Sequence, residues 1–184
     1  MGKSDNISFT KPTDSFVRFY DCRFKSSYFL SNFYPYPVSV QLPTEEESSA
    51  DVVEFACSEG LYHAKRAPGF PWREFKDLTG PQAWKKAQAL KITTSFAPEK
   101  FDIMLDVVRT KFQSKPLQEQ LLATKSAYLV ERTKDAFWGD KLDGTGANQL
   151  GRICMIVRGE LGGTGIVERP PEYEHFITLN SKKP

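Results

Sequence analysis

Short runs rich in apolar residues, some of them alternating with polar ones, occur at four places in the chain, and each predicts a β-strand. The runs cover residues 15–20, 37–42, 51–55 and 127–131. A hydrophilic loop at 44–49 separates the second run from the third. This arrangement predicts that the second and third strands form a hairpin.

Helical periodicity predicts five helices, at about 57–67, 81–91, 98–113, 117–124 and 149–161. Thr79 precedes the second helix, which has proline at its first position. Asn148 lies at the cap position of the last helix, which Gly162 and Gly163 end. The third helix carries apolar residues at spacings of 4, 3 and 4, which predict one buried stripe. This stripe consists of Phe101, Leu105, Val108 and Phe112.

The order of these elements predicts an α+β fold in which several helices pack on a small sheet. A chain of 184 residues with 40% hydrophobic and 26% charged residues is typical of a single globular domain, which we expect at 15–165. Residues 1–14 are polar and aperiodic and predict a flexible N-terminus. Residues 166–184 contain two adjacent prolines and predict an extended C-terminal tail.

The cysteine pattern is one indication of the cellular compartment of the protein. Cys22, Cys57 and Cys154 are widely spaced and form no CxxC pair, which argues against a disulfide framework and a structural zinc site. Residues 1–14 lack the apolar core of a signal peptide, and no run approaches the ~20 apolar residues of a membrane span. We therefore expect a cytoplasmic or nuclear protein with no membrane partner.

The chain lacks the common motifs of phosphate loops, dinucleotide folds, nucleophile elbows and HExxH metal sites. With only two histidines, His63 and His175, a metal site built on several histidines is excluded, and we expect no metal and no cofactor. The net charge is +2, but residues 61–115 hold 11 basic and 5 acidic residues. That segment suits a phosphate-bearing ligand or nucleic acid, although a solvated helix surface also explains it.

Side chains that can carry chemistry gather first at residues 59–66. On a helix, Glu59, Tyr62, His63 and Arg66 share one face, whereas Lys65 lies about 120° from Glu59. The alternative is an amphipathic helix with an exposed salt bridge.

A second cluster lies at residues 129–152. A strand ends at Glu131, Asp135 and Trp138 follow in the next turn, and a glycine-containing loop leads to Asn148 and Arg152 at a helix start. The two carboxylates can act as general base and electrostatic partner, and Trp138 offers a flat face to a base. A helix N-terminus binds phosphate well. The alternative is a loop held by Asx turns around a core tryptophan.

Both clusters belong to a pattern that runs over about 130 residues. It consists of FLSNFYP at 29–35, Glu59, Met104, Lys111, Phe112, LLAT at 121–124, LVE at 129–131, Asp135, Trp138, Gly139, Gly146, Asn148 and LGR at 150–152. In the order and spacing of these residues the chain resembles the NADAR family, also described as riboflavin-intermediate N-glycosidase-like proteins.

The resemblance implies a hydrolase that cleaves the bond between ribose C1 and an amino nitrogen on a pyrimidine or purine. One substrate type is guanine carrying ADP-ribose on its exocyclic amine, in DNA or as a nucleoside. The other is the phosphoribosylamino-pyrimidine intermediates of riboflavin synthesis. The basic middle segment favours the first type. A module that binds ADP-ribose or a nucleotide without turnover is a further alternative.

The residues expected to act in such a reaction fall into two groups. The catalytic candidates are Lys65, Glu59, Glu131 and Asp135. The substrate-binding candidates are Arg23, Asn32, Phe33, Arg66, Trp138, Gly146, Asn148 and Arg152. Phe33 and Trp138 suit stacking on a base. Arg23, Arg152 and the helix start at Asn148 suit the binding of phosphates.

One position departs from the family pattern. Members of the family usually have lysine seven residues after the helix glutamate, where this chain has Arg66. The resemblance suggests that this lysine forms an imine with the opened ribose, which a guanidinium group cannot do. We therefore expect a local shift of the helix to bring Lys65 into the site. The alternative is direct hydrolysis with Glu131 or Asp135 as the base.

Overall fold

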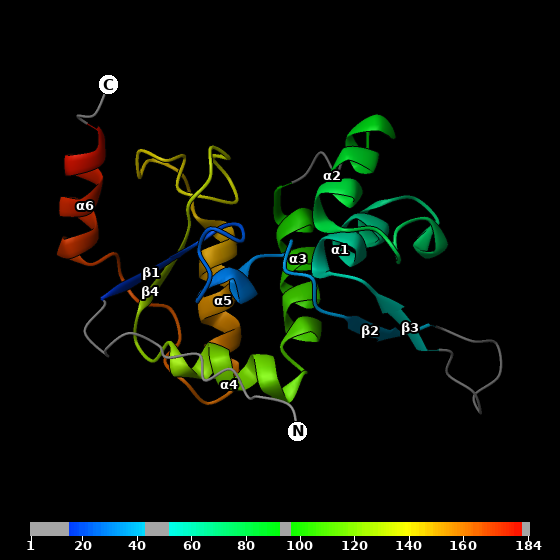
Figure 1. Cartoon of the computed structure of the whole chain (residues 1–184), viewed down its shortest axis with the longest axis horizontal. Coiled ribbons are helices and arrows are strands. Elements are labelled where there is room, and N and C mark those ends of the chain that lie inside the picture. Colours follow the sequence, from blue (N-terminus) through cyan, green and yellow to red (C-terminus); the bar gives the residue numbers. More distant parts are fainter. Residues whose placement is uncertain (1–14, 43–51, 93–96, 182–184) are drawn as a thin grey trace.

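The computed structural model describes residues 15–42, 52–92 and 97–181. The expected flexible N-terminus at 1–14 and hydrophilic loop at 44–49 lie outside these residues. Within them, the chain forms one α+β domain of six α-helices, two short 3₁₀ helices and four strands (Figure 1). The predicted fold class is thereby confirmed.

The four predicted strands are present, and they form two separate pairs instead of one small sheet. β2 (Val38–Gln41) and β3 (Val52–Phe55) form the predicted antiparallel hairpin. β1 (Phe16–Phe19) and β4 (Tyr128–Glu131) pair in parallel, with Phe19 opposite Glu131. Because the strands are parallel, the residues that follow them, including Tyr20, meet Glu131 at the same edge.

The five predicted helices are confirmed. They are α1 (Ser58–Arg66), α2 (Gly80–Ala89), α3 (Ala97–Lys111), α4 (Lys115–Ala123) and α5 (Gln149–Glu160). The side chain of Gln82 accepts the N–H of Thr79 at 2.9 Å, so Thr79 begins α2 as predicted. The 3₁₀ helices are η1 (Tyr28–Leu30), before β2, and η2 (Trp72–Glu74), between α1 and α2.

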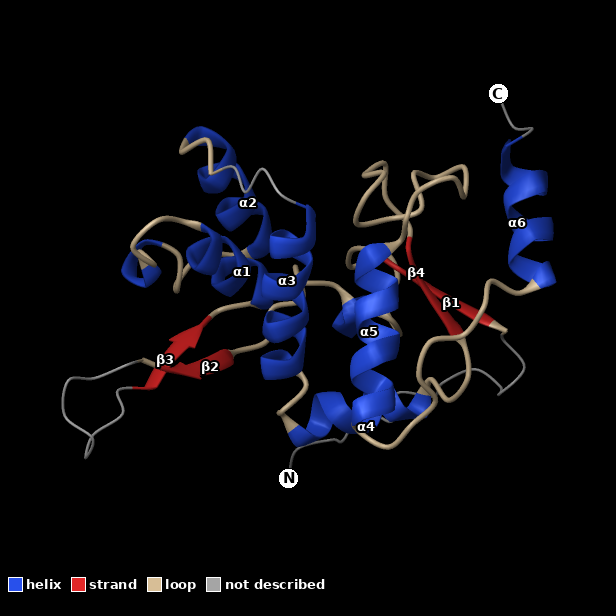
Figure 2. Ribbon diagram, turned by 180° about the vertical axis from the view of Figure 1, so that it is seen from behind, coloured by secondary structure: helices blue, strands red, loops and turns tan. Residues whose placement is uncertain are grey.

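Two neighbouring helices, α3 and α5, form the centre of the molecule (Figures 1 and 2). The helices α1 and α2 lie on one side of them, and the β1–β4 pair lies on the other. Gly151 allows α5 to approach β4 closely, because a Cβ there would lie 2.2 Å from the carbonyl oxygen of Leu129.

Because α3 contacts both α1 and α5, its buried face differs from the predicted stripe. Val108 and Phe112 are fully buried, but Phe101 and Leu105 are only half-buried. The rest of the buried face consists of Met104, Val107 and Lys111.

The prediction of an extended C-terminal tail is wrong for most of its length. Residues Pro171–Ser181 form α6, which covers the β1–β4 pair (Figure 1). The reason is tertiary: Tyr173 is fully buried, its ring lies 5.2 Å from Phe16 and 5.6 Å from Tyr128, and its hydroxyl donates to the buried Asp140. Within the described ranges, every helix is too short or too polar to cross a membrane.

Candidate active site

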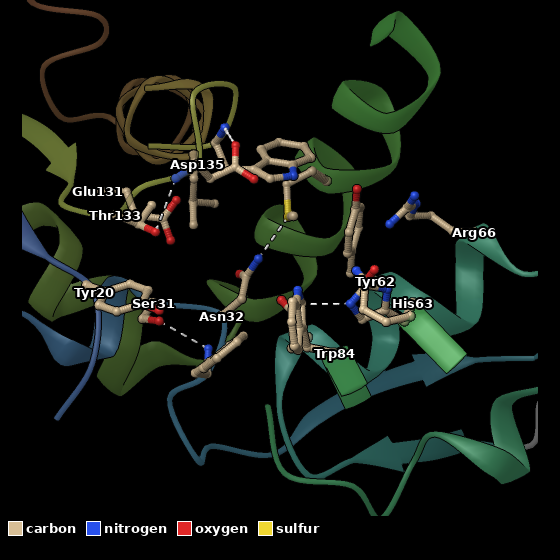
Figure 3. Close-up of a pocket in the computed structure, with 16 residues that line it drawn as sticks. Tyr20, Ser31, Asn32, Tyr62, His63, Arg66, Trp84, Glu131, Thr133 and Asp135 are labelled. Carbon is tan, nitrogen blue, oxygen red and sulfur yellow. Dashed lines mark hydrogen bonds and ion pairs between the residues drawn. The ribbon is translucent and has the colours of Figure 1, made fainter. Parts of the chain in front are cut away.

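A cavity of about 210 Å³ lies between α1, α2 and α3 on one side and the chain around β4 on the other (Figure 3). Glu131 and Asp135 face Tyr62, His63 and Arg66 across it. The lining residues are Tyr20, Ser31, Asn32, Phe33, Glu59, Tyr62, His63, Arg66, Trp84, Gln88, Met104, Glu131, Thr133, Asp135, Trp138 and Leu150.

Glu131 is the buried carboxyl group at the end of β4. Its backbone N–H donates to Asn148 Oδ1 at 2.9 Å, which holds the strand end against the start of α5. Burial, followed by the nearby carboxylates of Glu59, Asp135 and Asp140, raises the pKa of Glu131 from 4.5 to about 8. Glu131 is therefore protonated at neutral pH and can donate a proton inside the cavity.

Asp135 belongs to the exposed turn that follows β4. Its Oδ1 accepts hydrogen bonds from the backbone N–H groups of Phe137 and Trp138 at 2.8 and 2.7 Å. This is an Asx turn, which the sequence analysis gave as the alternative interpretation of this loop. This turn orients Trp138, whose ring meets Tyr62 edge-to-face at 5.7 Å. The site therefore contains the carboxylate and the aromatic group together, and both line the cavity.

The helix α1 contributes the opposite wall. As its periodicity predicts, Glu59, Tyr62, His63 and Arg66 all line the cavity. His63 Nε2 and Glu59 Oε1 form a buried hydrogen bond of 2.9 Å. The guanidinium of Arg66 lies over the ring of Tyr62, 5.0 Å from its centroid. Burial raises the pKa of the Tyr62 hydroxyl, so this group remains protonated.

The expected shift that would bring Lys65 into the site does not occur. The helix α1 is continuous through Arg66, and Lys65 Nζ forms an ion pair with Asp106 on α3 at 2.6 Å. Lys65 lines a different hollow, next to β2 and β3. The regular helix therefore leaves Arg66, and not Lys65, facing Glu131 and Asp135.

The loop after η1 forms the floor of the cavity between these walls (Figure 3). Lys111, fully buried on α3, donates to the carbonyl oxygen of Ser31 at 2.8 Å. The Asn32 side-chain amide donates to the sulfur of Met104 at 2.9 Å. These two contacts orient Asn32 so that its amide group lies at the centre of the site.

Among the described residues, four buried side-chain polar atoms lack a hydrogen-bond partner, and all four belong to residues that line this cavity. They are Asn32 Oδ1, Tyr62 Oη, His63 Nδ1 and Glu131 Oε2. An unpaired buried polar atom costs about 1–3 kcal/mol. Their gathering in one cavity indicates a site built to hydrogen-bond a polar ligand.

Asn148 and the start of α5 have a role different from the predicted phosphate site. Asn148 has a left-handed backbone (φ 49°), and its side chain donates to the carbonyl oxygen of Leu129 at 2.9 Å. The first amides of α5, on Gln149 and Leu150, donate to the carbonyls of Phe137 and Trp138. The first two amides of the helix are therefore occupied by the protein's own loop instead of being offered to a phosphate.

Gly146, Arg152 and Arg23 also lie outside the cavity. Gly146 is packed so tightly that a Cβ would lie 2.3 Å from the carbonyl oxygen of Gly139. Gly146 and Arg152 line a separate hollow beside Arg169. Arg23 is exposed, pairs with Asp21 and lines a third hollow.

The structure thus gathers only part of the predicted set. The cavity includes Glu59, Glu131, Asp135, Asn32, Phe33, Arg66 and Trp138, and it excludes Lys65, Arg23, Gly146, Asn148 and Arg152. Sequence reasoning assigned no role to Tyr20, Trp84 or Gln88. The helical pattern of α2 does place Trp84 and Gln88 on one face, but only the packing of α2 on α1 brings that face to the cavity.

Metal-binding side chains are not clustered here. In the described part of the chain, no group of three or more His, Cys, Asp or Glu residues is arranged to hold a metal ion. The chemistry available to the residues in the cavity is proton transfer, stabilisation of positive charge by carboxylates, and stacking.

Comparisons with known proteins identify relatives of this chain. Residues 18–162 match the NADAR domain family. A riboflavin biosynthesis protein of Vibrio vulnificus is 38% identical over 72% of this chain, and one of Zea mays is 30% identical over 86%. The chain spans only 35% and 25% of the length of these two relatives.

A relative of similar size is the N-glycosidase YbiA of Escherichia coli, which is 29% identical over 80% of this chain and 89% of its own length. The solution structure of YbiA superimposes with a TM-score of 0.60 at 26% identity, covering 81% of this chain and 86% of that one. The arrangement of helices and strands is therefore shared with a protein that is named for its cleavage of N-glycosidic bonds.

Proposed function

The chain belongs to the NADAR family, and on that premise we propose that it is an N-glycosidase that hydrolyses the bond between ribose C1 and an amino nitrogen on a base. The observation that carries the proposal is the cavity itself. In it a protonated Glu131 lies opposite the face of α1 that carries Glu59, and the four unpaired buried side-chain polar atoms of the described residues belong to its lining.

Glycosidic cleavage needs a proton for the departing nitrogen and stabilisation of the positive charge that develops on the ribose. We assign the first task to Glu131, because its raised pKa keeps it protonated at pH 7. Asp135 and Glu59 carry out the second task and take the proton of the attacking water. In the balanced reaction, water oxygen bonds to C1, the C1–N bond breaks, Glu131 protonates the nitrogen, and a carboxylate receives the water proton.

Direct hydrolysis is preferred here over a route through an imine. An imine requires an amine nucleophile in the cavity, but Lys65 is paired with Asp106 outside it, and the guanidinium of Arg66 is not a nucleophile at neutral pH. Arg66 instead supplies a fixed positive charge at the cavity wall, which suits a phosphate or a ribose hydroxyl.

For the substrate we propose guanine carrying ADP-ribose, in nucleic acid or as a nucleoside. The cavity of about 210 Å³ is small compared with the ~300–1,000 Å³ of typical ligand sites, so most of a dinucleotide would lie outside it. Trp84, which is 50% exposed, and Gln88 line the cavity from α2, within the basic segment 61–115. An exposed aromatic ring beside basic residues suits the outer base and the phosphates of such a ligand.

A phosphoribosylamino-pyrimidine intermediate of riboflavin synthesis is the second candidate, favoured by the names of the Vibrio and maize relatives. A module that binds ADP-ribose without turnover is the third, favoured by Arg66 at the position where the family usually has lysine.

The decisive experiment offers both substrates to the purified protein side by side and measures the released base. We expect release from ADP-ribosylated guanosine, with kcat/KM falling as the pH rises above about 8, because Glu131 then loses its proton. Glu131→Gln and Asp135→Asn should each lower turnover at least ~10²-fold with unchanged folding.

Each contrary outcome identifies a different error. Release only from the pyrimidine substrate would replace the proposed substrate by the second candidate. Binding of ADP-ribose with no release from either substrate would establish the binding module. Full activity in both carboxylate variants would refute the assigned mechanism.

A further inference from the structure

His63 is a cavity residue that the proposed reaction does not use. The chain has only one other histidine, His175, which is exposed on α6. His63 is 2% exposed, and its imidazole is held between the rings of Tyr62 and Phe75, with centroids 5.2 and 6.4 Å away. The ring is therefore fixed, and the bonds that its two nitrogens make are defined by the fold.

The two nitrogens differ in their surroundings. Nε2 lies 2.9 Å from Glu59 Oε1, whereas Nδ1 is buried with no partner in the described part of the chain. A carboxylate accepts hydrogen bonds and cannot donate them, so an ionised Glu59 requires the proton to be on Nε2. This bond occupies one carboxylate oxygen, and no described residue forms a hydrogen bond to the other oxygen, Oε2.

A buried carboxylate needs a fixed hydrogen-bond donor to hold its orientation. Apart from His63 and Glu59, the titratable groups that line the cavity are Tyr62 and Arg66 on the same helix, and Tyr20, Glu131 and Asp135 from other elements. Within the cavity, His63 forms a side-chain hydrogen bond to Glu59. The geometry resembles other cases in which a histidine and a carboxylate fix one another's orientation.

We propose that His63 is a positioning residue for Glu59: its Nε2–H holds the Glu59 side chain in place, with Oε2 directed to the reacting ribose. The inference rests on the proposed glycosidase function and adds a residue to it.

A set of variants tests this assignment through the coupling between the two residues. His63→Leu removes the donor, and we expect kcat to fall at least ~10-fold with little change in KM. The loss should be smaller than the ~10²–10⁴-fold that a positioned acid or base itself contributes, because Glu59 is still present. His63→Gln places an amide N–H near the position of Nε2 and should restore most of kcat. His175→Gln is the matched control and should leave kcat unchanged.

The double variant separates positioning from general stability. Glu59→Asp keeps a carboxylate but withdraws it from Nε2, so adding His63→Leu to it should cause no further loss of kcat. Losses that multiply in the double variant would overturn the inference, as would full activity of His63→Leu. Thermal unfolding of each variant identifies losses that come from misfolding.

Nitrogen NMR of labelled histidine gives a second readout that does not depend on turnover. We expect His63 to carry its proton on Nε2, and the exposed His175 to exchange between both tautomers. A proton on Nδ1 alone would overturn the inference, because Glu59 would then have to be the protonated donor. If the wild-type protein releases base from neither substrate, the proposed function fails, and this role of His63 fails with it whatever the tautomer.

Discussion

Replacement of Glu131 by glutamine tests the electrostatics of the site through protein stability, without any substrate. Glutamine has nearly the shape of a protonated glutamate but cannot ionise. Glu131 is 8% exposed, and its pKa is raised from 4.5 to about 8 in the folded protein. Between these two values the folded state holds a proton that the unfolded state has released.

The direction in which stability changes with pH follows from proton linkage. Because the folded protein binds more protons than the unfolded chain between pH 4.5 and about 8, the free energy of unfolding falls as the pH rises through this window. Each tenfold change in the acid dissociation constant of Glu131 changes the free energy of unfolding by about 1.4 kcal/mol, so the loss of stability over this pH window is at most about 5 kcal/mol. Above pH 8 the wild-type protein holds a buried, ionised carboxylate among three other carboxylates.

We therefore expect Glu131→Gln to be more stable than the wild-type protein by at least about 2 kcal/mol at pH 8, and nearly equal to it at pH 4.5. Urea unfolding followed by circular dichroism at several pH values measures this difference, with the slope against urea checked for constancy. Glu119→Gln, an exposed substitution on α4, is the control and should show no such trend. A difference between Glu131→Gln and wild type that does not change with pH would refute the reasoning.

Four further changes test other parts of the structure. Trp138→Ala should weaken ligand binding by roughly 1–3 kcal/mol, the scale of base–aromatic stacking, as measured by calorimetry. Lys65→Ala should change stability by less than about 1 kcal/mol and leave turnover intact, and borohydride should trap no adduct on this lysine. Gly80→Ala should cost about 1–3 kcal/mol and raise KM, because its Cβ would lie 2.7 Å from Phe33 in the cavity wall. The pKa of Lys111 is lowered to about 8 by burial, so stability should rise between pH 8 and 10.5, and Lys111→Met should remove this rise.

Local signals in the sequence were enough to predict the four strands and five of the six α-helices of the described residues. Thr79 and the proline after it define the start of α2, and the polar loop between β2 and β3 indicates their hairpin, since these signals act over a few residues. The face of α1 that carries Glu59 and Arg66 also follows from helix geometry alone. Family resemblance, by contrast, suggested a displaced Lys65, and the regular helix does not provide it.

The sequence by itself thus determined most of the elements, the family and one wall of the site. Only the tertiary structure decided the parallel pairing of β1 with β4, which places Tyr20 beside Glu131 although more than 100 residues separate them. It also decided that Asn148 fastens β4 to α5 and that α6 forms where a tail was expected. The physical reason is that such contacts draw their energy from burial and hydrogen bonds between distant segments, which no local pattern records.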